Sequence, residues 1–341
     1  MLKYKKIPKY LILIISFSLI IFSCSPQLKK KDFNRTIFNK YYSTFNFSKS
    51  STQINTIFNS VKFINSIAFY KTYFFDTNGK IENINPTVLK SNSVGTSYDT
   101  KTASGTASII YNKNFKLAFL TCAHIVDFPD TLYSYHKINK KIYIESVSIK
   151  QRQQNYINEL VDGNKMKILI SDEEQDMAIL IKETSHNKQY SVLNRLLFND
   201  EQIDIGTKIY IFGYPKGNEM ITQGIVGNVK ENNYIIDSQF NRGQSGGMVF
   251  VTKSDYPNFE LLGMAKSSAA DFHLFLTPKD DYLSEKYNLS IPYDDDIYLK
   301  KFAFINYGLT NVIPIEIINK FLKKNKKVLE NNDYLLKDFF K

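Results

Sequence analysis

The stretch Asn241-Arg242-Gly243-Gln244-Ser245-Gly246-Gly247 carries the clearest signal in this sequence of 341 residues. Its glycines adopt backbone conformations that other residues avoid, so the stretch predicts a tight turn that exposes the Ser245 side chain. A serine hydroxyl is a poor nucleophile near neutral pH and needs a base within hydrogen-bond reach. The same turn can direct the backbone N–H groups of Gly243 and Ser245 at one point, where they would stabilise a negatively charged oxygen. Taken alone, the stretch is equally compatible with a turn that has no chemistry.

Two further motifs supply the partners that such a serine requires. Thr121-Cys122-Ala123-His124 ends an apolar run, where a strand would present His124 at the edge of a β-barrel. Asp176 stands at the mouth of the apolar run 177–181, and a carboxylate there needs a polar partner such as His124. Asp172, in a more polar turn, is the alternative carboxylate. The three motifs together predict a base, an orienting acid and a nucleophile.

Cys122 lies beside His124 and raises the alternative of a reactive thiol. Adjacent residues of a strand point to opposite sides, and free cysteines are commonly just buried. Both considerations favour a structural role for Cys122.

Short apolar runs separated by turn residues recur along the chain. The expected strands are Thr106–Tyr111, Leu117–Ala123, Ile142–Lys150, Met166–Ser171, Met177–Ile181, Lys208–Phe212, Ile221–Val229, Tyr234–Asp237, Met248–Val251 and Leu261–Ala265. Many short strands at this spacing predict an all-β barrel or sandwich. Near the end of the chain, residues 314–329 begin with proline and carry apolar residues on one face, which predicts a helix.

These motifs resemble the trypsin-like serine proteases, and most closely the protease domain of the HtrA (Deg) family. The segments that carry the resemblance are Gly105–Ile110, Thr121–Asp127, Asp176–Leu180, Ile211–Pro215, Gln223–Val226, Asp237–Gly247 and Val312–Ile315. The resemblance covers residues 54–331 and implies an all-β, two-barrel chymotrypsin-like fold with a C-terminal helix. About residues 54–195 would form the N-terminal barrel, 196–331 the C-terminal barrel and closing helix, and 332–341 a tail.

The resemblance also implies a serine endopeptidase that acts on polypeptides. His124 and Asp176 would come from the N-terminal barrel and Ser245 from the C-terminal one. His124 would act first as general base and then as general acid, by way of an acyl-enzyme on Ser245. The N–H groups of Gly243 and Ser245 would form the oxyanion hole. No cofactor and no metal ion is expected.

Four residues are implied in substrate binding. By alignment, Gln239 would lie at the base of the primary pocket, where a neutral amide offers no charge to an arginine or lysine side chain. Met264, Ala265 and Lys266 would form the strand that pairs with the substrate backbone. Gln244 replaces the aspartate with which pancreatic-type proteases bind a new N-terminus, so activation by that ion pair is not expected.

The polar stretch 271–300 is unlike the family. It carries clustered acidic residues, Asp280, Asp281 and Asp294–Asp296. A calcium site is one interpretation because carboxylate oxygens are the ligands that calcium prefers, but the spacing of an EF-hand is missing. A solvated loop is the expectation that we favour.

The N-terminus has the features of an export signal. Four lysines precede the apolar run 10–22, which is shorter than the roughly 20 residues that span a bilayer. Cys24 follows, and the pattern resembles a bacterial lipobox, in which the cysteine is lipidated. We expect residues 1–23 to be a lipoprotein signal peptide and 24–53 a tether that holds the domain at a bacterial membrane, facing the periplasm or the cell surface. An uncleaved signal anchor or an ordinary cleaved signal would also export the domain.

The charge of the chain excludes one class of partner. The formal net charge is +11, but the excess lysines are scattered and no nucleic-acid-binding motif accompanies them. We therefore expect no nucleic-acid partner. With Cys24 lipidated, Cys122 would have no partner and the exported domain no disulfide.

Two other functions stay open at the level of the sequence. A catalytically silent protease-fold protein that binds polypeptides would carry the same motifs, because an unformed oxyanion hole is invisible in a sequence. A lipid-anchored surface adhesin would explain the N-terminus but would leave the three motifs unexplained.

Overall fold

The computed structural model describes residues 47–335 except 77, 79–80, 82–88, 140, 161–164, 186–189, 194–202, 253–258 and 278–296. The predicted signal peptide, Cys24 and the clustered aspartates Asp280, Asp281 and Asp294–Asp296 lie outside these residues. Within the described part of the chain, no helix is both long and apolar enough to cross a membrane.

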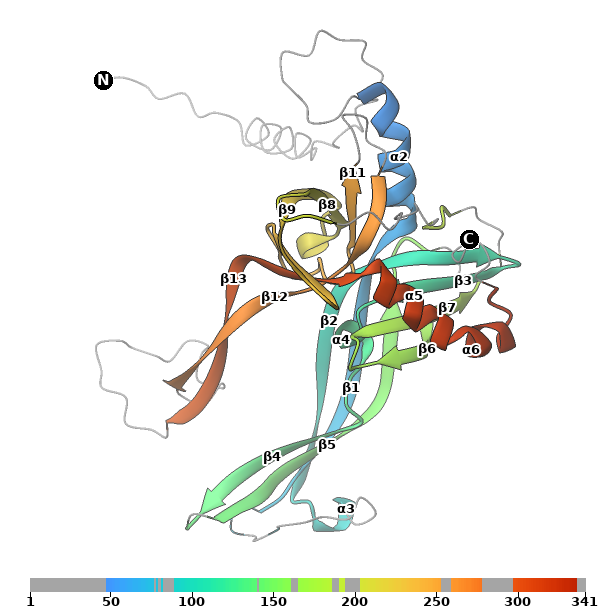
Figure 1. The fold of residues 1–341 in the computed structure, drawn as a ribbon. Helices are drawn as coiled ribbons and strands as arrows, with labels where there is room; N and C mark the ends of the chain where they lie inside the picture. Colours follow the sequence, from blue (N-terminus) through green and yellow to red (C-terminus); the bar gives the residue numbers. More distant parts are fainter. Residues whose placement is uncertain are drawn as a thin grey trace, which may run out of the picture. The chain divides into compact units, whose positions relative to one another are not determined.

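The first half of the described chain forms a closed barrel. Its strands are β1 (Val61–Phe74), β2 (Gly95–Lys113), β3 (Lys116–Thr121), β4 (Thr131–Ile138), β5 (Lys141–Tyr156), β6 (Lys165–Asp172) and β7 (Met177–Glu183). The order β1-β2-β3-β7-β6-β5 is closed by antiparallel pairing of β5 with β1, and β4 adds to the free side of β5 (Figure 1). All seven strands are antiparallel to their neighbours, as hairpin connections require.

The second half forms another closed barrel of six strands. They are β8 (Lys208–Gly213), β9 (Met220–Lys230), β10 (Asn233–Asp237), β11 (Met248–Thr252), β12 (Phe259–Thr277) and β13 (Tyr298–Pro314), in the order β10-β13-β12-β11-β8-β9. The predicted all-β, two-barrel chymotrypsin-like fold is thus confirmed. The gap between β7 and β8 contains the predicted boundary between the barrels near residue 195.

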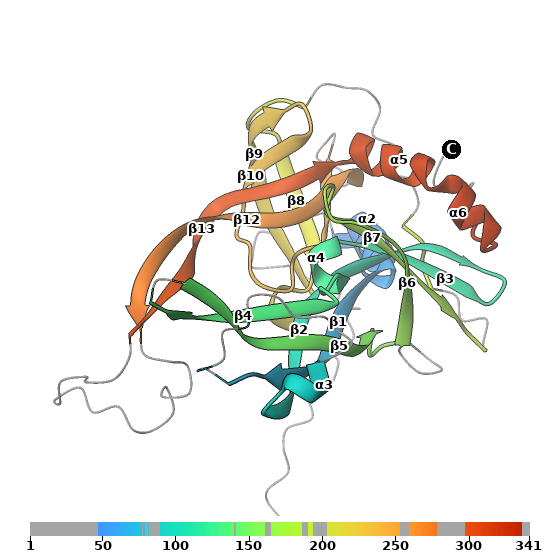
Figure 2. The ribbon, with the colours of Figure 1, turned by 90° about the horizontal axis from the view of Figure 1, so that it is seen from below.

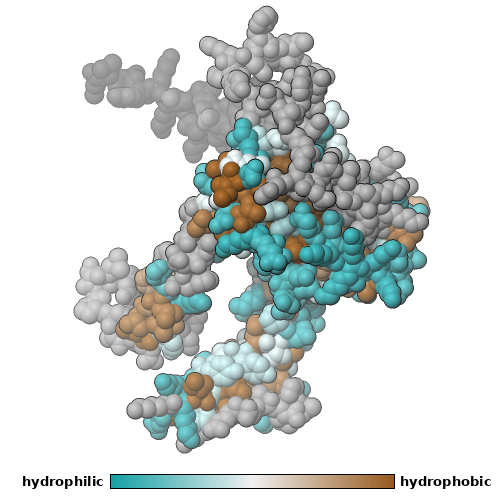
Figure 3. Space-filling view, viewed as in Figure 1, coloured by the Kyte–Doolittle hydropathy of each residue, from teal (hydrophilic) through white to brown (hydrophobic). Residues whose placement is uncertain are grey.

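Several strands are longer than the sequence predicts, because they continue past their barrel. β1, β2 and β5 run on beside β4 as one arm, and β12 and β13 leave the second barrel together as a two-stranded ribbon (Figures 1 and 2). The described flanks of the stretch 271–300 are therefore strands, which corrects the expectation for these flanks. The expected solvated loop and the alternative calcium site at residues 278–296 lie outside the described residues. Apolar side chains gather toward the end of this ribbon (Figure 3), where Leu274, Leu276 and Leu299 are more than 60% exposed.

The helices are short and mostly flank the barrels. They are α2 (Phe47–Ser60), α3 (Leu89–Asn92), α4 (Ala123–Val126), the 3-10 turn η2 (Pro215–Gly217), α5 (Ile315–Lys324) and α6 (Lys326–Asn331). Helix α2 covers residues 47–53, which the sequence analysis assigned to the tether. Its Phe58 ring packs against Phe212 of the second barrel at 5.1 Å between centroids.

The predicted C-terminal helix is present but is split in two. Pro314 precedes it, as expected, and Ile318 and Phe321 are fully buried in the core. The break falls at Asn325, whose side-chain Nδ2 donates to the carbonyl of Phe321 at 2.9 Å and so competes with the helical backbone bond. Beyond α6, Tyr334 packs against Tyr111 of β2, so the segment that follows the second barrel closes onto the first.

The two barrels meet where Thr106 of β2 contacts the turn that contains Ser245. The Thr106 N–H donates to the Ser245 carbonyl at 2.7 Å. The next residue, Gly246, has a φ of +83°, and a Cβ there would lie 2.0 Å from the Thr106 carbonyl oxygen. The junction therefore requires glycine at position 246, both for the backbone conformation and for the close approach.

Gly246→Ala is expected to lower the free energy of unfolding much more than Gly206→Ala. Both glycines have positive φ angles, but a Cβ at Gly206 would meet no heavy atom within 4 Å. The backbone conformation alone costs about 1–2 kcal/mol, and the clash with Thr106 adds about 1–3 kcal/mol. Urea unfolding measures both changes, with Gly95→Ala as a control because that position has neither a positive φ nor a close neighbour. An equal decrease in the free energy of unfolding for Gly246→Ala and Gly206→Ala would contradict the close approach of Gly246 to Thr106.

Candidate active site

Four successive carbonyl groups in the turn between β10 and β11 are fixed by hydrogen bonds. Each accepts a hydrogen bond: Arg242 from Lys216 N at 2.6 Å, Gly243 from Thr106 Oγ1 at 2.7 Å, Gln244 from Gly247 N at 2.9 Å, and Ser245 from Thr106 N at 2.7 Å. Gly243 has a φ of +94°, and a Cβ there would lie 2.3 Å from the Tyr214 carbonyl. The turn is thus held in one conformation from both barrels.

Within the segment 243–247, two backbone amides have no acceptor among the described residues. The N–H groups of Gln244, Gly246 and Gly247 donate within the protein, whereas those of Gly243 and Ser245 find no acceptor in the described part of the chain. In a trans peptide the C=O and the following N–H point to opposite sides. The bond from Lys216 to the Arg242 carbonyl therefore turns the Gly243 N–H away from Lys216. Both residues line the hollow described below, as an oxyanion hole requires.

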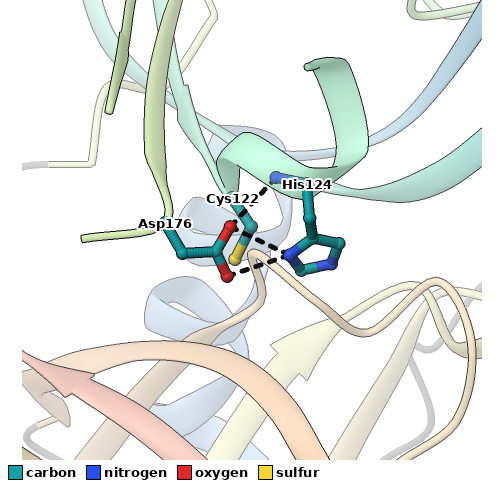
Figure 4. Close-up of side chains that lie close together, drawn as sticks. All are labelled: Cys122, His124 and Asp176. Carbon is teal, nitrogen blue, oxygen red and sulfur yellow. Dashed lines mark hydrogen bonds and ion pairs between the residues drawn. The ribbon is translucent and has the colours of Figure 1, made fainter. Parts of the chain in front are cut away.

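His124 and Asp176 are joined by three short contacts (Figure 4). The His124 Nδ1 lies 2.9 Å from Oδ2 and 3.0 Å from Oδ1 of Asp176, and the His124 backbone N–H donates to Oδ1 at 2.9 Å. Asp176 is only 6% exposed and has a φ of +56° in the tight turn before β7, a conformation that aspartate tolerates better than most residues. The carboxylate thereby orients the imidazole and leaves its Nε2 for another partner.

Asp172, the alternative carboxylate, bonds other partners. Asp172 accepts from the Gln175 N–H at 3.0 Å and lies 3.4 Å from Lys324 Nζ. These two partners, the backbone N–H first, hold the pKa of the Asp172 carboxyl below its ordinary value. Of the two candidates, only Asp176 contacts His124.

His124 and Ser245 face the same hollow, which has a volume of about 570 Å3. The other lining residues are Asn65, Ser66, Ile67, Thr102, Ala103, Ser104, Tyr156, Arg242 and Gly243. Within the described residues, no hydrogen bond joins Ser245 Oγ to His124 Nε2. Such catalytic bonds are often long in the absence of substrate and shorten when it binds.

Residues 105–255 match the family model of the trypsin-like peptidase domain. A similar solved structure is the Rv3671c protease from M. tuberculosis in its active form, at 15% sequence identity and a TM-score of 0.42. That match covers 86% of this chain and 92% of the other. A search of curated proteins found no match.

Cys122 is closer to His124 than the sequence suggests. The ligand atoms of Cys122, His124 and Asp176 all lie within 4.8 Å of one another (Figure 4). Strand alternation does not separate these side chains, because residues two positions apart in a strand point to the same side. In the structure β3 ends at Thr121, and His124 belongs to helix α4.

The Cys122 thiol is nevertheless unsuited to chemistry. The side chain is fully buried, Sγ lies 3.6 Å from the Ala265 carbonyl, and burial raises the pKa of the thiol well above its ordinary value. A nucleophile or a metal ligand would have to be a thiolate. The buried thiol is thus a poor nucleophile, and the structural interpretation of Cys122 fits its surroundings.

The residues implied in substrate binding fall into two groups. Gln239 is exposed and does not line the hollow of Ser245, because its neighbour Phe240 turns into the core of the second barrel. Ala265 contacts the nucleophile turn directly: its N–H donates to Gly247 and its carbonyl accepts from Gly246, both at 2.8 Å. The role of Gln239 at the base of the primary pocket stays a prediction.

The strand that contains Ala265 continues as an open edge. Met264 and Ala265 are buried, whereas Lys266 is half-buried and lines a second hollow of about 600 Å3. In the described chain, β12 pairs with β11 up to Met264 and from there on only with β13. The backbone of Lys266 and Ser267 is consequently available to an extended peptide.

Thr106 is the contributor that the sequence analysis missed. The segment Gly105–Ile110 resembles a barrel strand, and this resemblance does not predict the two contacts of Thr106 with the turn. The sequence offers no distinct signal, because Thr106 is one of several threonines and serines in β2 and its burial is apparent only in the structure.

Cys122 is expected to resist thiol reagents in the folded protein even at pH 9, near the ordinary pKa of a cysteine. Since the folded-state pKa is raised, the thiol stays neutral there, whereas the unfolded chain forms the reactive thiolate. A Cys24→Ala variant, which leaves Cys122 as the single thiol, is treated with Ellman's reagent with and without urea. Rapid reaction without urea would contradict the burial of this side chain.

Proposed function

We propose that the chain is a serine endopeptidase that hydrolyses peptide bonds. The observation that carries this proposal is the paired His124 and Asp176 facing the same hollow as Ser245 and the two unused amides. Ser245 Oγ attacks the substrate carbonyl carbon while His124 Nε2 accepts its proton. The resulting oxyanion is stabilised by the N–H groups of Gly243 and Ser245.

The rest of the reaction follows from the same groups. The protonated His124 gives its proton to the leaving amine, and the acyl group stays on Ser245. Water then attacks the acyl-enzyme with His124 again as the base, which releases the acid and restores the serine. Asp176 stays ionised and stabilises the imidazolium in both steps. Among trypsin-like domains, the motifs around these residues and the uncharged Gln244 favour the HtrA (Deg) type.

A fluorophosphonate probe is expected to label the wild type at Ser245 and to leave Ser245→Ala unlabelled. His124→Ala loses the general base and should reduce kcat on the order of 10⁶-fold, and Asp176→Asn about 10⁴-fold. Asp172→Asn is the matched control, because this carboxylate bonds Gln175 and Lys324 and not His124. A folded wild-type protein that never labels would remove the endopeptidase proposal.

A second candidate is a catalytically silent protein that binds polypeptides. The open edge of β12 at Lys266 and Ser267 would hold an extended peptide whether or not that peptide is cut. Casein turnover separates the two functions: an endopeptidase degrades casein, whereas a silent binder retains it intact. Binding of casein by Ser245→Ala serves as the reference in both cases.

We further propose that the protein is exported and held at a bacterial membrane by lipid on Cys24. The proposal rests on the lysine-rich start, the apolar run and the cysteine that follows it.

A Cys24→Ala variant is expected to lose incorporation of labelled palmitate and to move from the membrane fraction to the soluble fraction. Without the thiol there is no acceptor for the lipid, and the rest of the export signal is unchanged. Cys122→Ala is the control, because its buried thiol should leave fractionation unaltered. Palmitate incorporation into Cys24→Ala would contradict the assignment.

A further inference from the structure

Thr106 makes an unusual set of hydrogen bonds for a strand residue. Its side-chain oxygen lies 2.7 Å from the Gly243 carbonyl and 3.0 Å from the Tyr214 N–H, and its own N–H bonds Ser245. The residue is fully buried, so water cannot substitute for these partners. Thr121 Oγ1 in turn donates to the Thr106 carbonyl at 2.7 Å and fixes the residue within the first barrel.

The direction of the side-chain bonds is determined by their partners. The Tyr214 N–H can only donate, so the Thr106 oxygen accepts from it. The hydroxyl proton is then directed at the Gly243 carbonyl, which can only accept. One hydroxyl therefore links the turn that precedes η2 to the turn that contains Ser245.

Both peptide groups that flank Gly243 are consequently clamped. The preceding carbonyl, that of Arg242, accepts from Lys216 N, and the carbonyl of Gly243 itself accepts from Thr106. With both peptide planes held, the direction of the Gly243 N–H is fixed. Without the Thr106 hydroxyl, the peptide group between Gly243 and Gln244 has no hydrogen-bond partner in the described part of the first barrel.

We infer that Thr106 is a positioning residue for the reaction of Ser245, and that its hydroxyl holds the Gly243 N–H in line with the oxyanion. The inference rests on the proposed function. The hydroxyl touches no reacting atom and acts through Gly243. Its removal should weaken stabilisation of the transition state more than binding of the substrate, since the oxyanion exists only after Ser245 has attacked.

A series at position 106 tests this inference. Thr106→Val keeps the volume and removes the hydroxyl, and kcat on a short chromogenic peptide is expected to fall about 10- to 100-fold with KM changed less than about threefold. Thr106→Ser keeps the hydroxyl and should retain kcat within about threefold, although it loses a buried methyl group. Thr106→Cys, a weaker donor, should lie between them. If Thr106→Val fails to fold, a higher kcat in Thr106→Ser than in Thr106→Cys supports the inference, and equal kcat values contradict it.

Thr72→Val is the matched control. This threonine is also buried in the first barrel sheet, and its Oγ1 bonds Ser148 Oγ at 2.8 Å rather than the turn of Ser245. It should lose stability without loss of kcat. Unchanged kcat in Thr106→Val, or an equal loss in Thr106→Ser, would overturn the inference while the endopeptidase proposal stands. A folded wild-type protein that is never labelled by the fluorophosphonate probe would contradict both the inference on Thr106 and the endopeptidase proposal.

Discussion

The meeting of Thr106 with the turn 242–245 is the contact on which the geometry of the site depends. It joins residues 137 positions apart in the chain, through a backbone bond to Ser245 and a hydroxyl bond to Gly243. Each barrel alone supplies only part of the arrangement: the first holds His124 and Asp176, and the second holds Ser245. Because the bonds are buried and short, the relative placement of these groups is set by barrel packing and not by a flexible loop.

A second constraint acts within the first barrel. Asp176 accepts from both the backbone and the ring of His124, in a backbone conformation that few residues tolerate. The carboxylate is almost fully buried, so these donors take the place of water around its oxygens. The geometry of the imidazole is thereby coupled to the turn that precedes β7. The site is made from two turns and the short helix α4, which are joined to other segments by hydrogen bonds.

Local sequence patterns predict part of this and leave the rest undetermined. Glycines 243 and 246 do have positive φ angles, and the motifs around His124 and Asp176 lead to residues that are in contact. The positions of Cys122 and Gln239 cannot be predicted from local patterns. The position of Cys122 depends on where β3 ends and α4 begins, and the position of Gln239 depends on the packing of its neighbour Phe240 into the barrel core. The long arms were missed for a related reason. Strand length past the barrel is set by pairing between segments distant in sequence, and local composition does not report it.

The separation of Thr106 from the turn it bonds also sets an order of events during synthesis. A ribosome adding about 5–20 residues per second takes on the order of ten seconds to reach Ser245 after Thr106 has been made. His124 and Asp176 are added during that interval, and Ser245 is added at its end. The hydrogen bonds between Thr106 and the turn 242–245 can therefore form only after the second barrel has begun to fold against the first.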